Sequence, residues 1–541
     1  MTYSLKYQLH WAWKISSNYQ AQLFLYFILE LFSILSSLLF VFYSKNAIDI
    51  ATKSTTGTLQ QQIILVIVCL LSALLFKTLA SYLSQKSQLK FVISLQNKVL
   101  NKQLNAVWTS FYQRETGDLM VRMNADVNEV VQMISQVSIS LILTIIKVLA
   151  SFGMLWFLDP ILAVIILAIS PLIMLSKYYY KKLRVLTKKV RAFEGRVANG
   201  MQENFRDRLL IKSLGLIDNY IQRFVALQKD LLNLKTKQLN LNIYSQSLVK
   251  FTLSIGYLIA FVWGVFRLNN QDMSFGTLTA FIQLVNRIQN PMLGLMGFLP
   301  AFIRFRTSAD RLIEVLEAEQ ENQNNVTVIE PSTIHFDQVG FKYKDQTVLE
   351  NINLTIHKGD VVAIVGASGK GKTTILRLLL NLLKPTSGKI LIKNQAEQVI
   401  PIDHQTKMNF AYVPQGNSLF TGTIKDNLAK PGQSVTDEQI TEAIHLASAE
   451  FIYDLPNGIY TKVGEGGFGL SEGQAQRIAI ARAMMLNYDL WLFDEATSAL
   501  DSDTSAQIFE NLTKKGQGKI LIFVTHDLDL ANKCQYIVNL T

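Results

Sequence analysis

A glycine-rich turn at residues 366–374 has the clearest capacity for chemistry in this sequence. It follows the apolar run 361–365 and precedes the apolar run 375–380, so the pattern predicts a buried strand, a turn and a helix. Its glycines let the backbone approach a polyphosphate, while Lys372 supplies a positive charge and Thr373 a hydroxyl for Mg²⁺. The stretch therefore predicts nucleotide phosphate binding. The residues expected around the phosphates are Gly366, Ala367, Ser368, Gly369, Lys370, Gly371, Lys372, Thr373 and Thr374.

Polar side chains also follow other apolar runs of the C-terminal half. The run 490–493 ends in Asp494 and Glu495. A strand-end aspartate coordinates Mg²⁺ in a P-loop fold, and Glu495 beside it is placed to polarise a water. Such a pair alone is usually a solvated strand end, but the upstream P-loop favours the functional interpretation. Gln415 ends another predicted strand and is a candidate to contact Mg²⁺ or the attacking water.

Two further segments belong to this set. Residues 470–477 indicate a turn that opens a helix, whose first amides could hold another phosphate. His526 follows the apolar run 520–524. A lone histidine is usually structural, but this one ends a strand that we expect to run parallel to the two strands already assigned.

Composition places part of the chain in lipid. The 541 residues are 49% hydrophobic, which is high for a soluble enzyme. A formal charge of +11 is compatible with a nucleic-acid surface, but Lys and Arg also accumulate in cytoplasmic loops of membrane proteins, and we favour that explanation. Cys69 and Cys534 form neither a disulfide framework nor a metal-ligand pattern, so we assign them no function.

Six apolar runs have about the length needed to cross a bilayer, roughly 20 residues. Long basic connections follow the second and fourth runs, whereas the other connections carry few positive charges, which predicts that both long connections and the N-terminus are cytoplasmic. We expect these helices to continue beyond the bilayer, with short turns near residues 116–118 and 204–207. The predicted spans are about 21–43, 62–82, 135–157, 161–178, 243–266 and 277–299.

The expected fold class is an α-helical membrane domain of six transmembrane helices with long cytoplasmic extensions, followed by an α/β P-loop nucleotide-binding domain. Hydropathy falls after Pro300, and short β-branched runs alternate with helical stretches from Ile334 onward. The expected organisation is an interfacial segment at 1–20, a transmembrane domain at 21–300, a linker at 301–330 and an ATP-binding domain at 331–541.

With its motifs in this order, the chain resembles an ABC transporter half-subunit of the exporter type over nearly its whole length. The resemblance implies that Tyr343 stacks on adenine and that residues 366–373 form the Walker A loop. It further implies a Q-loop glutamine, a Walker B aspartate, a general base, a D-loop aspartate and a switch histidine; these are Gln415, Asp494, Glu495, Asp501 and His526.

The resemblance also implies how the chain works with a partner. Its signature residues Ser471, Gly473 and Gln474 would close over the P-loop of a second chain, identical or homologous, with two ATP molecules and Mg²⁺ between them. Thr373, Gln415 and Asp494 would contact the metal. Residues 111–126 and 203–215 resemble the coupling segments of the family, and the expected location is the cell membrane, as a multi-pass protein.

Two departures from the family pattern stand out. Glu472 replaces the usual glycine of the signature, so its carboxylate either repels the facing nucleotide or points away and leaves Ser471 and Gly473 to contact phosphate. The sequence ends at Thr541, where the family usually continues with another strand and helices.

The substrate stays open between a lipid, a drug-like amphiphile and a peptide. No peptidase segment precedes the first span, which weakens leader-peptide processing. Glu30, Lys77 and Lys147 are ionisable residues in apolar runs; Glu30 and Lys147 either line the translocation path, or pair or lie at an interface. An ATP-gated regulatory subunit is the alternative function, against which an intact Glu495 argues, and the spans argue against a nucleic-acid partner.

Overall fold

The computed structural model describes residues 3–110, 116–169, 177–321, 329–343, 346–367, 369–403, 406, 409–429, 435–464, 469–486 and 488–540. Contacts divide the chain into two compact units. The first comprises Met1–Asn101 and Thr116–Leu316, and the second comprises Lys102–Glu115 and Glu317–Thr541. The first unit is helical, and the second contains the sheets, so the fold class expected from the sequence is confirmed.

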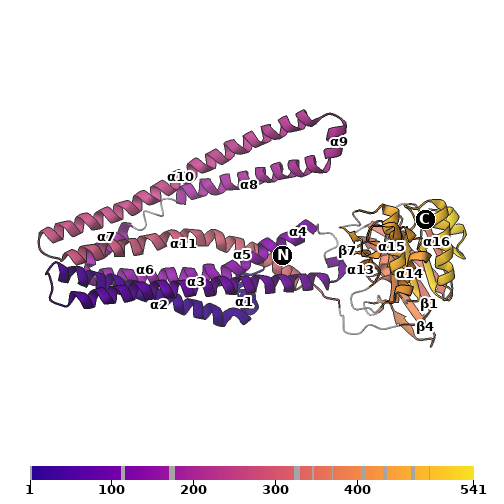
Figure 1. The fold of residues 1–541 in the computed structure, drawn as a ribbon, viewed down its shortest axis with the longest axis horizontal. Helices are drawn as coiled ribbons and strands as arrows, with labels where there is room; N and C mark the ends of the chain where they lie inside the picture. The colour runs from indigo at the N-terminus through magenta and orange to yellow at the C-terminus, as the bar shows by residue number, and fades with distance from the viewer. Residues whose placement is uncertain are drawn as a thin grey trace. The chain divides into compact units, whose positions relative to one another are not determined.

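Long helices make up the first unit (Figure 1). Short π-helical turns at Arg122–Asp126 and Met133–Val137 interrupt the third long helical stretch without breaking it. The helices are α1 (Leu5–Ile15), α2 (Gln20–Ala51), α3 (Leu59–Leu104), α4 (Thr116–Val121), α5 (Val127–Gln132), α6 (Ser138–Leu158), α7 (Pro160–Ile169), α8 (Lys177–Arg206), α9 (Arg208–Ser213), α10 (Ile217–Asn269) and α11 (Phe275–Leu316).

Four helical stretches of the described residues are long and apolar enough to cross a membrane. They correspond to the predicted first, second, third and fifth spans. The predicted fourth span runs through α7 and into residues outside the described part of the chain. The predicted sixth span lies in α11, which contains Arg287 and is not among the four. The four stretches are Ser17–Ala51, Leu59–Leu104, Asp118–Leu158 and Ile217–Asn269.

Buried aspartates fix the helix ends on one side of this unit. Asp159 lies between α6 and α7, where its carboxylate accepts hydrogen bonds from the Leu162 amide at 3.0 Å, the Trp263 indole at 3.0 Å and Arg267 at 2.6 Å. Asp49 near the end of α2 accepts the Gly276 amide at the start of α11 at 2.8 Å. A buried carboxylate is stable only when it is paired in this way, so these contacts hold the helix ends together.

The turns expected in the long connections lie near helix boundaries. A turn is expected near residues 116–118; α3 ends at Leu104, and α4 begins at Thr116. Residues 111–115, inside the expected coupling segment, lie outside the described residues. The second expected turn agrees with the structure, because α8 ends at Arg206 and α9 begins at Arg208.

Helices α8 and α10 form a two-helix arm that ends at α9 (Figure 1). Gln238 donates a hydrogen bond to Thr187 at 2.9 Å, and Lys235 pairs with Glu194 at 2.7 Å, so polar contacts join the two helices. Leu209, at the end of the arm, is 84% exposed.

The second unit is an α/β domain with two main sheets. A parallel sheet has the strand order β11-β3-β10-β9-β6, and an antiparallel sheet has the order β2-β1-β4-β5. Its helices are α12 (Lys372–Leu379), α13 (Ile424–Leu428), α14 (Asp437–Leu446), α15 (Glu472–Met484), α16 (Ser502–Lys515) and α17 (Leu528–Asn532). Its strands are β1 (Pro331–Tyr343), β2 (Gln346–His357), β3 (Val361–Gly366), β4 (Ser387–Asn394), β5 (Val399–Pro401), β6 (Phe410–Val413), β7 (Gly422–Thr423), β8 (Lys462–Val463), β9 (Leu490–Asp494), β10 (Ile520–Val524) and β11 (Tyr536–Leu540).

The central strands of the parallel sheet are buried along their whole length. All five residues of β9 and of β10 are buried, as the apolar runs in the sequence predict for strands covered on both faces. The parallel pairing aligns Val524 at the end of β10 with Asp494 at the end of β9. The carboxyl ends of these strands therefore meet at one edge of the sheet.

Candidate nucleotide-binding site

The glycine-rich turn joins β3 to α12, as the sequence predicts. Gly369 and Gly371 have φ angles of 82° and 90°, which glycine adopts without the steric cost that a side chain brings. At Gly371 an added Cβ would lie 2.8 Å from Leu349, so the turn also packs closely against β2. Lys372 is buried, and its ammonium donates to the carbonyl oxygens of Gly366 at 2.8 Å and Ala367 at 3.3 Å. The loop is thus folded around the ammonium group.

Asp494 and Thr373 meet across the edge of the parallel sheet. The Thr373 hydroxyl donates to Asp494 Oδ1 at 3.2 Å, and the Tyr412 hydroxyl lies 3.4 Å from Asp494 Oδ2. Burial raises the pKa of Asp494, and the neighbouring Glu495 charge raises it further, whereas the two hydroxyl groups lower it. A hydroxyl and a carboxylate side by side are hard oxygen ligands, so this pair fits one edge of a Mg²⁺ coordination shell.

Glu495 lies between two polar residues that follow other strands, Gln415 after β6 and His526 after β10. Gln415 donates to Glu495 Oε2 at 2.7 Å, and His526 Nδ1 is 3.7 Å from Glu495 Oε1. The Glu495 backbone has a φ of 49°, which is uncommon for a residue with a side chain and costs about 1–3 kcal/mol. The Glu495 amide donates to the Val524 carbonyl at 2.9 Å, so β10 holds this conformation. The residues predicted to handle the attacking water therefore lie together.

The signature residues form the N-terminus of α15. Ser471 is its N-cap, and Ser471 and Gln474 form a capping box, with bonds of 3.2 Å from the Gln474 amide and 2.9 Å to the Gln474 side chain. Both side chains are thus engaged in the helix start, while the first amides of α15 remain directed along its axis. Glu472 is exposed in the first turn.

Gly473 contacts the segment that follows β9. A Cβ at this position would lie 2.8 Å from the Ala499 carbonyl oxygen and 3.1 Å from Leu500. Gln476, one turn along α15 and only 1% exposed, accepts the Ala499 amide at 3.2 Å. The backbone of the signature helix is therefore packed against the backbone of residues 496–500, a contact that no pattern in the sequence predicts.

Two of the residues assigned by resemblance have structural partners. Asp501 caps α16, because its carboxylate accepts the Thr504 amide at 2.9 Å, and this bond lowers the pKa of Asp501. Tyr343 ends β1, where its ring packs edge-on against Phe341 with centroids 4.8 Å apart and its hydroxyl lies 3.4 Å from Arg377. Ser368 of the predicted loop lies outside the described residues.

The segment after Gln415 is tied to helices α13 and α15 by residues that the sequence analysis did not select. Arg482 donates to the Ser418 carbonyl at 3.1 Å and to its hydroxyl at 3.0 Å. Asn427 exchanges two bonds of 2.8 Å with the backbone of Phe420. These contacts fix the course of the loop, and the partners Arg482 and Ser418 are 64 residues apart, so no local pattern indicates their contact.

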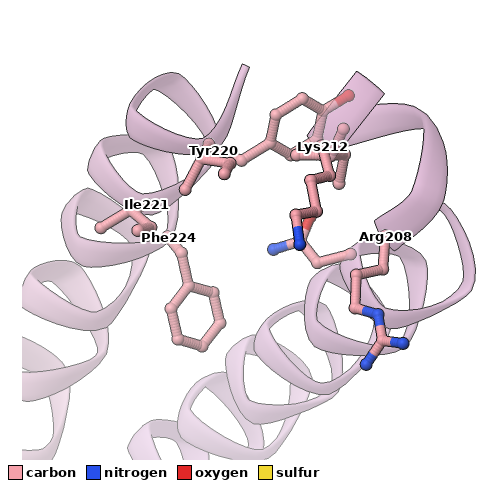
Figure 2. A pocket seen from close by; sticks show the side chains of 8 residues that line it. Arg208, Lys212, Tyr220, Ile221 and Phe224 are labelled. Atoms are coloured by element: carbon pink, nitrogen blue, oxygen red, sulfur yellow. The ribbon is translucent and has the colours of Figure 1, made fainter. Parts of the chain in front are cut away.

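A second candidate site is a hollow of about 320 Å³ at the tip of the arm. Figure 2 shows Arg208 and Lys212 from α9 on one side and Tyr220, Ile221 and Phe224 from α10 on the other. The hollow lies beside part of the predicted coupling segment 203–215. Its lining combines two cations with apolar and aromatic groups, which suits contact with a mixed protein surface.

Comparison with known proteins agrees with this fold. The family model described as ABC transporter transmembrane region matches residues 23–292, and the model described as ABC transporter matches residues 349–498. Together the two matches span most of the chain. The chain belongs to the ABC transporter family, as a half-transporter of the exporter type with a fused transmembrane region and ATP-binding domain. It is a multi-pass membrane protein and an ATPase.

Individual relatives support the same assignment. A protein of Staphylococcus aureus strain NCTC 8325, named as a candidate multidrug export ATP-binding/permease protein, is 29% identical over 466 residues, 84% of this chain and 80% of that protein. The corresponding protein of strain RF122 is 28% identical over the same shares. The structure of a bacterial Atm1-family ABC exporter with ATP bound has a TM-score of 0.78 and 23% identity, covering 97% of this chain and 94% of that chain, which supports the fold.

Proposed function

We propose that two copies of this chain, or this chain and a homologue, export a substrate by alternating access. The observation that supports this most is the convergence of Thr373, Asp494, Gln415, Glu495 and His526 at the carboxyl ends of neighbouring strands. In this arrangement ATP binds between two such domains. The N-terminus and the ATP-binding domain lie in the cytoplasm, as the charge asymmetry of the connections indicates.

The site residues have distinct roles in this proposal. Lys372 exchanges its bonds to loop carbonyls for bonds to the β- and γ-phosphates. Thr373 and Asp494 would hold Mg²⁺, with Gln415 as a further oxygen ligand, and the bound ion would supply positive charge beside the phosphates. Glu495 accepts the proton of the attacking water, and His526 lies beside it to sense the γ-phosphate.

The second chain completes the site in this proposal. Ser471, Gly473 and Gln474 lie at the N-terminus of α15, whose amides and positive dipole suit the phosphate of the nucleotide held by the other chain. Asp501 directly follows residues 496–500, which pack against α15. Tyr343, at the end of β1, stacks on adenine in this proposal. Residues 203–215 at the tip of the arm, which resemble a coupling segment of the family, transmit closure of the ATP-binding domains to the helices.

The experiment is Mg²⁺-dependent ATP hydrolysis by the purified chain in lipid nanodiscs, with Glu495→Gln as the inactive control. We expect turnover by the chain alone that falls at least 100-fold in the variant, while ATP binding persists. A folded chain that binds ATP and shows no turnover contradicts a competent homodimer. Glu472→Gly then distinguishes a disabling carboxylate, which the substitution relieves, from a missing homologous partner, which it does not.

A further inference from the structure

The membrane helices contain an unbalanced set of charges. The six predicted spans contain a single acidic residue in the sequence, Glu30. Three basic residues stand on helices adjacent to it: Lys77 on α3, Lys147 on α6 and Arg287 on α11. Charged groups at membrane depth are costly, so such residues usually have a partner or a function.

Helix directions place three of these residues at one level. Hydrogen bonds from Ser33 to the Ala73 carbonyl and from Ser87 to Gln22 show that α2 and α3 run antiparallel. An apolar cluster joins α2, α3 and α6 and has three buried members. About one helical turn from each buried member lies a charged residue, and all three charged residues are displaced toward the same end of the bundle. The pairs are Tyr26 with Glu30, Ala80 with Lys77, and Leu143 with Lys147.

Electrostatic interactions connect the four residues. The charges of Lys77 and Lys147 act on Glu30, and the charge of Arg287 acts on Lys147. Arg287 donates to the Ser37 hydroxyl of α2 at 2.7 Å, which holds the guanidinium next to the helix that carries Glu30. We call Glu30, Lys77, Lys147 and Arg287 the charged layer.

The charged layer has an excess of two positive charges. Glu30 forms no ion pair within 4.0 Å among the described residues, and even full neutralisation by Glu30 would leave two cations uncompensated. One turn beyond Lys147, the hydroxyl of Ser151 is fully buried and has no hydrogen-bond partner in the described part of the chain. Both observations indicate that this level of the bundle is completed by a group that brings negative charge and hydrogen-bond acceptors.

We propose that the charged layer binds the anionic group of the transported molecule, so that the substrate class is an amphiphile with a phosphate, carboxylate or sulfate head. The apolar cluster below the layer suits an aliphatic or aromatic tail. Cationic amphiphiles are disfavoured, because three like charges face them and one opposite charge attracts them. This inference rests on the proposed export function and deepens it.

The test compares probes with the same tail and opposite heads. Dodecyl phosphate and dodecyltrimethylammonium are titrated into the full chain in nanodiscs of zwitterionic phosphatidylcholine. Equilibrium binding is measured in the Glu495→Gln background, which makes it independent of turnover, and stimulation of ATP hydrolysis is measured in the unaltered chain. We expect the phosphate to bind at least about tenfold more tightly, equal to about 1.4 kcal/mol, and to be the only probe that stimulates hydrolysis.

Charge variants separate a binding role from a packing role. Lys147→Gln and Arg287→Gln should each weaken phosphate binding about tenfold, Lys147→Arg should retain it, and Lys250→Gln, an exposed cation on α10, should leave it unchanged. Glu30→Gln should strengthen binding, since it removes a competing anion. Weaker binding in Glu30→Gln, or equal affinity for both probes, overturns the proposal.

Further arms identify the source of the anion and isolate failure of the export function. Stimulation by phosphatidylglycerol in the nanodisc and not by soluble butyl phosphate supports a lipid headgroup, and the reverse supports a soluble anion. If neither phosphatidylglycerol nor butyl phosphate stimulates hydrolysis, and dodecyl phosphate does not bind more tightly than dodecyltrimethylammonium, the inference is wrong. Absence of basal hydrolysis concerns the proposed export function alone, because the binding arm does not need turnover.

Discussion

Gly473→Ala tests whether the signature glycine is required for packing within one chain. The added Cβ would lie 2.8 Å from the Ala499 carbonyl oxygen, whereas ordinary carbon–oxygen contacts are about 3.3–3.6 Å, so the backbone must move by at least about 0.5 Å. That backbone is held by Gln476, which accepts the Ala499 amide at 3.2 Å, and by the Leu500 amide, which donates to Thr497 at 3.1 Å. The loop therefore resists the movement.

The expected cost follows from two opposing terms. Overpacking costs about 1–3 kcal/mol, and replacing a helical glycine by alanine returns about 0.5–1 kcal/mol, so the midpoints of the two ranges leave a net destabilisation of about 1 kcal/mol. For a domain of this size, each kcal/mol lowers the unfolding midpoint by about 2–4 °C. We expect the Gly473→Ala chain without nucleotide to unfold about 2–4 °C lower, with faster hydrogen exchange at residues 496–505.

Thermal unfolding and hydrogen exchange of the nucleotide-free chain distinguish packing from phosphate contact. If Gly473 serves only to admit phosphate, the nucleotide-free chain keeps its stability, and only hydrolysis is lost. The matched control is Gly200→Ala in α8, where an added Cβ meets no atom within 4 Å. An unchanged midpoint and unchanged exchange in Gly473→Ala would refute the packing argument.

Three further predictions concern the same unit. Tyr412→Phe removes a hydrogen bond that lowers the pKa of Asp494, a pKa that burial already raises. In the variant the carboxylate is therefore protonated at a higher pH, and the acid limb of the pH profile of kcat/KM should move to higher pH. An acid limb at an unchanged pH would contradict this. Asp501→Ala should destabilise the chain by about 1 kcal/mol through loss of the α16 cap, whereas Asp501→Asn should keep the cap. Equal free energies of unfolding for the two variants, measured with denaturant, would rule out capping. Glu472→Gly should raise turnover at saturating ATP severalfold if its carboxylate repels the facing nucleotide, and steady-state hydrolysis that stays the same would show that the side chain points away.

The local elements could be predicted from sequence because their signals are local. The strand, turn and helix at residues 361–380 follow from a buried apolar run, glycines and an amphipathic stretch, and the structure confirms them. The long apolar helices follow from run length, and the break between α3 and α4 ends at Thr116, near the expected turn. Helix ends are less certain than helix existence, because they depend on tertiary contacts as much as on the nearby residues.

The sequence by itself determined the chemistry of the nucleotide site, since residue types and their order along the chain are enough to identify a phosphate loop and its acidic partners. Only the tertiary structure decided which side chains meet. Gln415 and His526 reach Glu495, Tyr412 reaches Asp494, and Gly473 packs on Ala499.

The same limit applies in the membrane domain. Lys147 and Glu30 are visible in the sequence as isolated charges, but helix direction and packing bring them to one level with Lys77. Hydropathy and periodicity indicate on which face of its helix or strand a residue lies. They carry no information on contacts between residues that are distant in the chain, which the packing of the whole chain establishes.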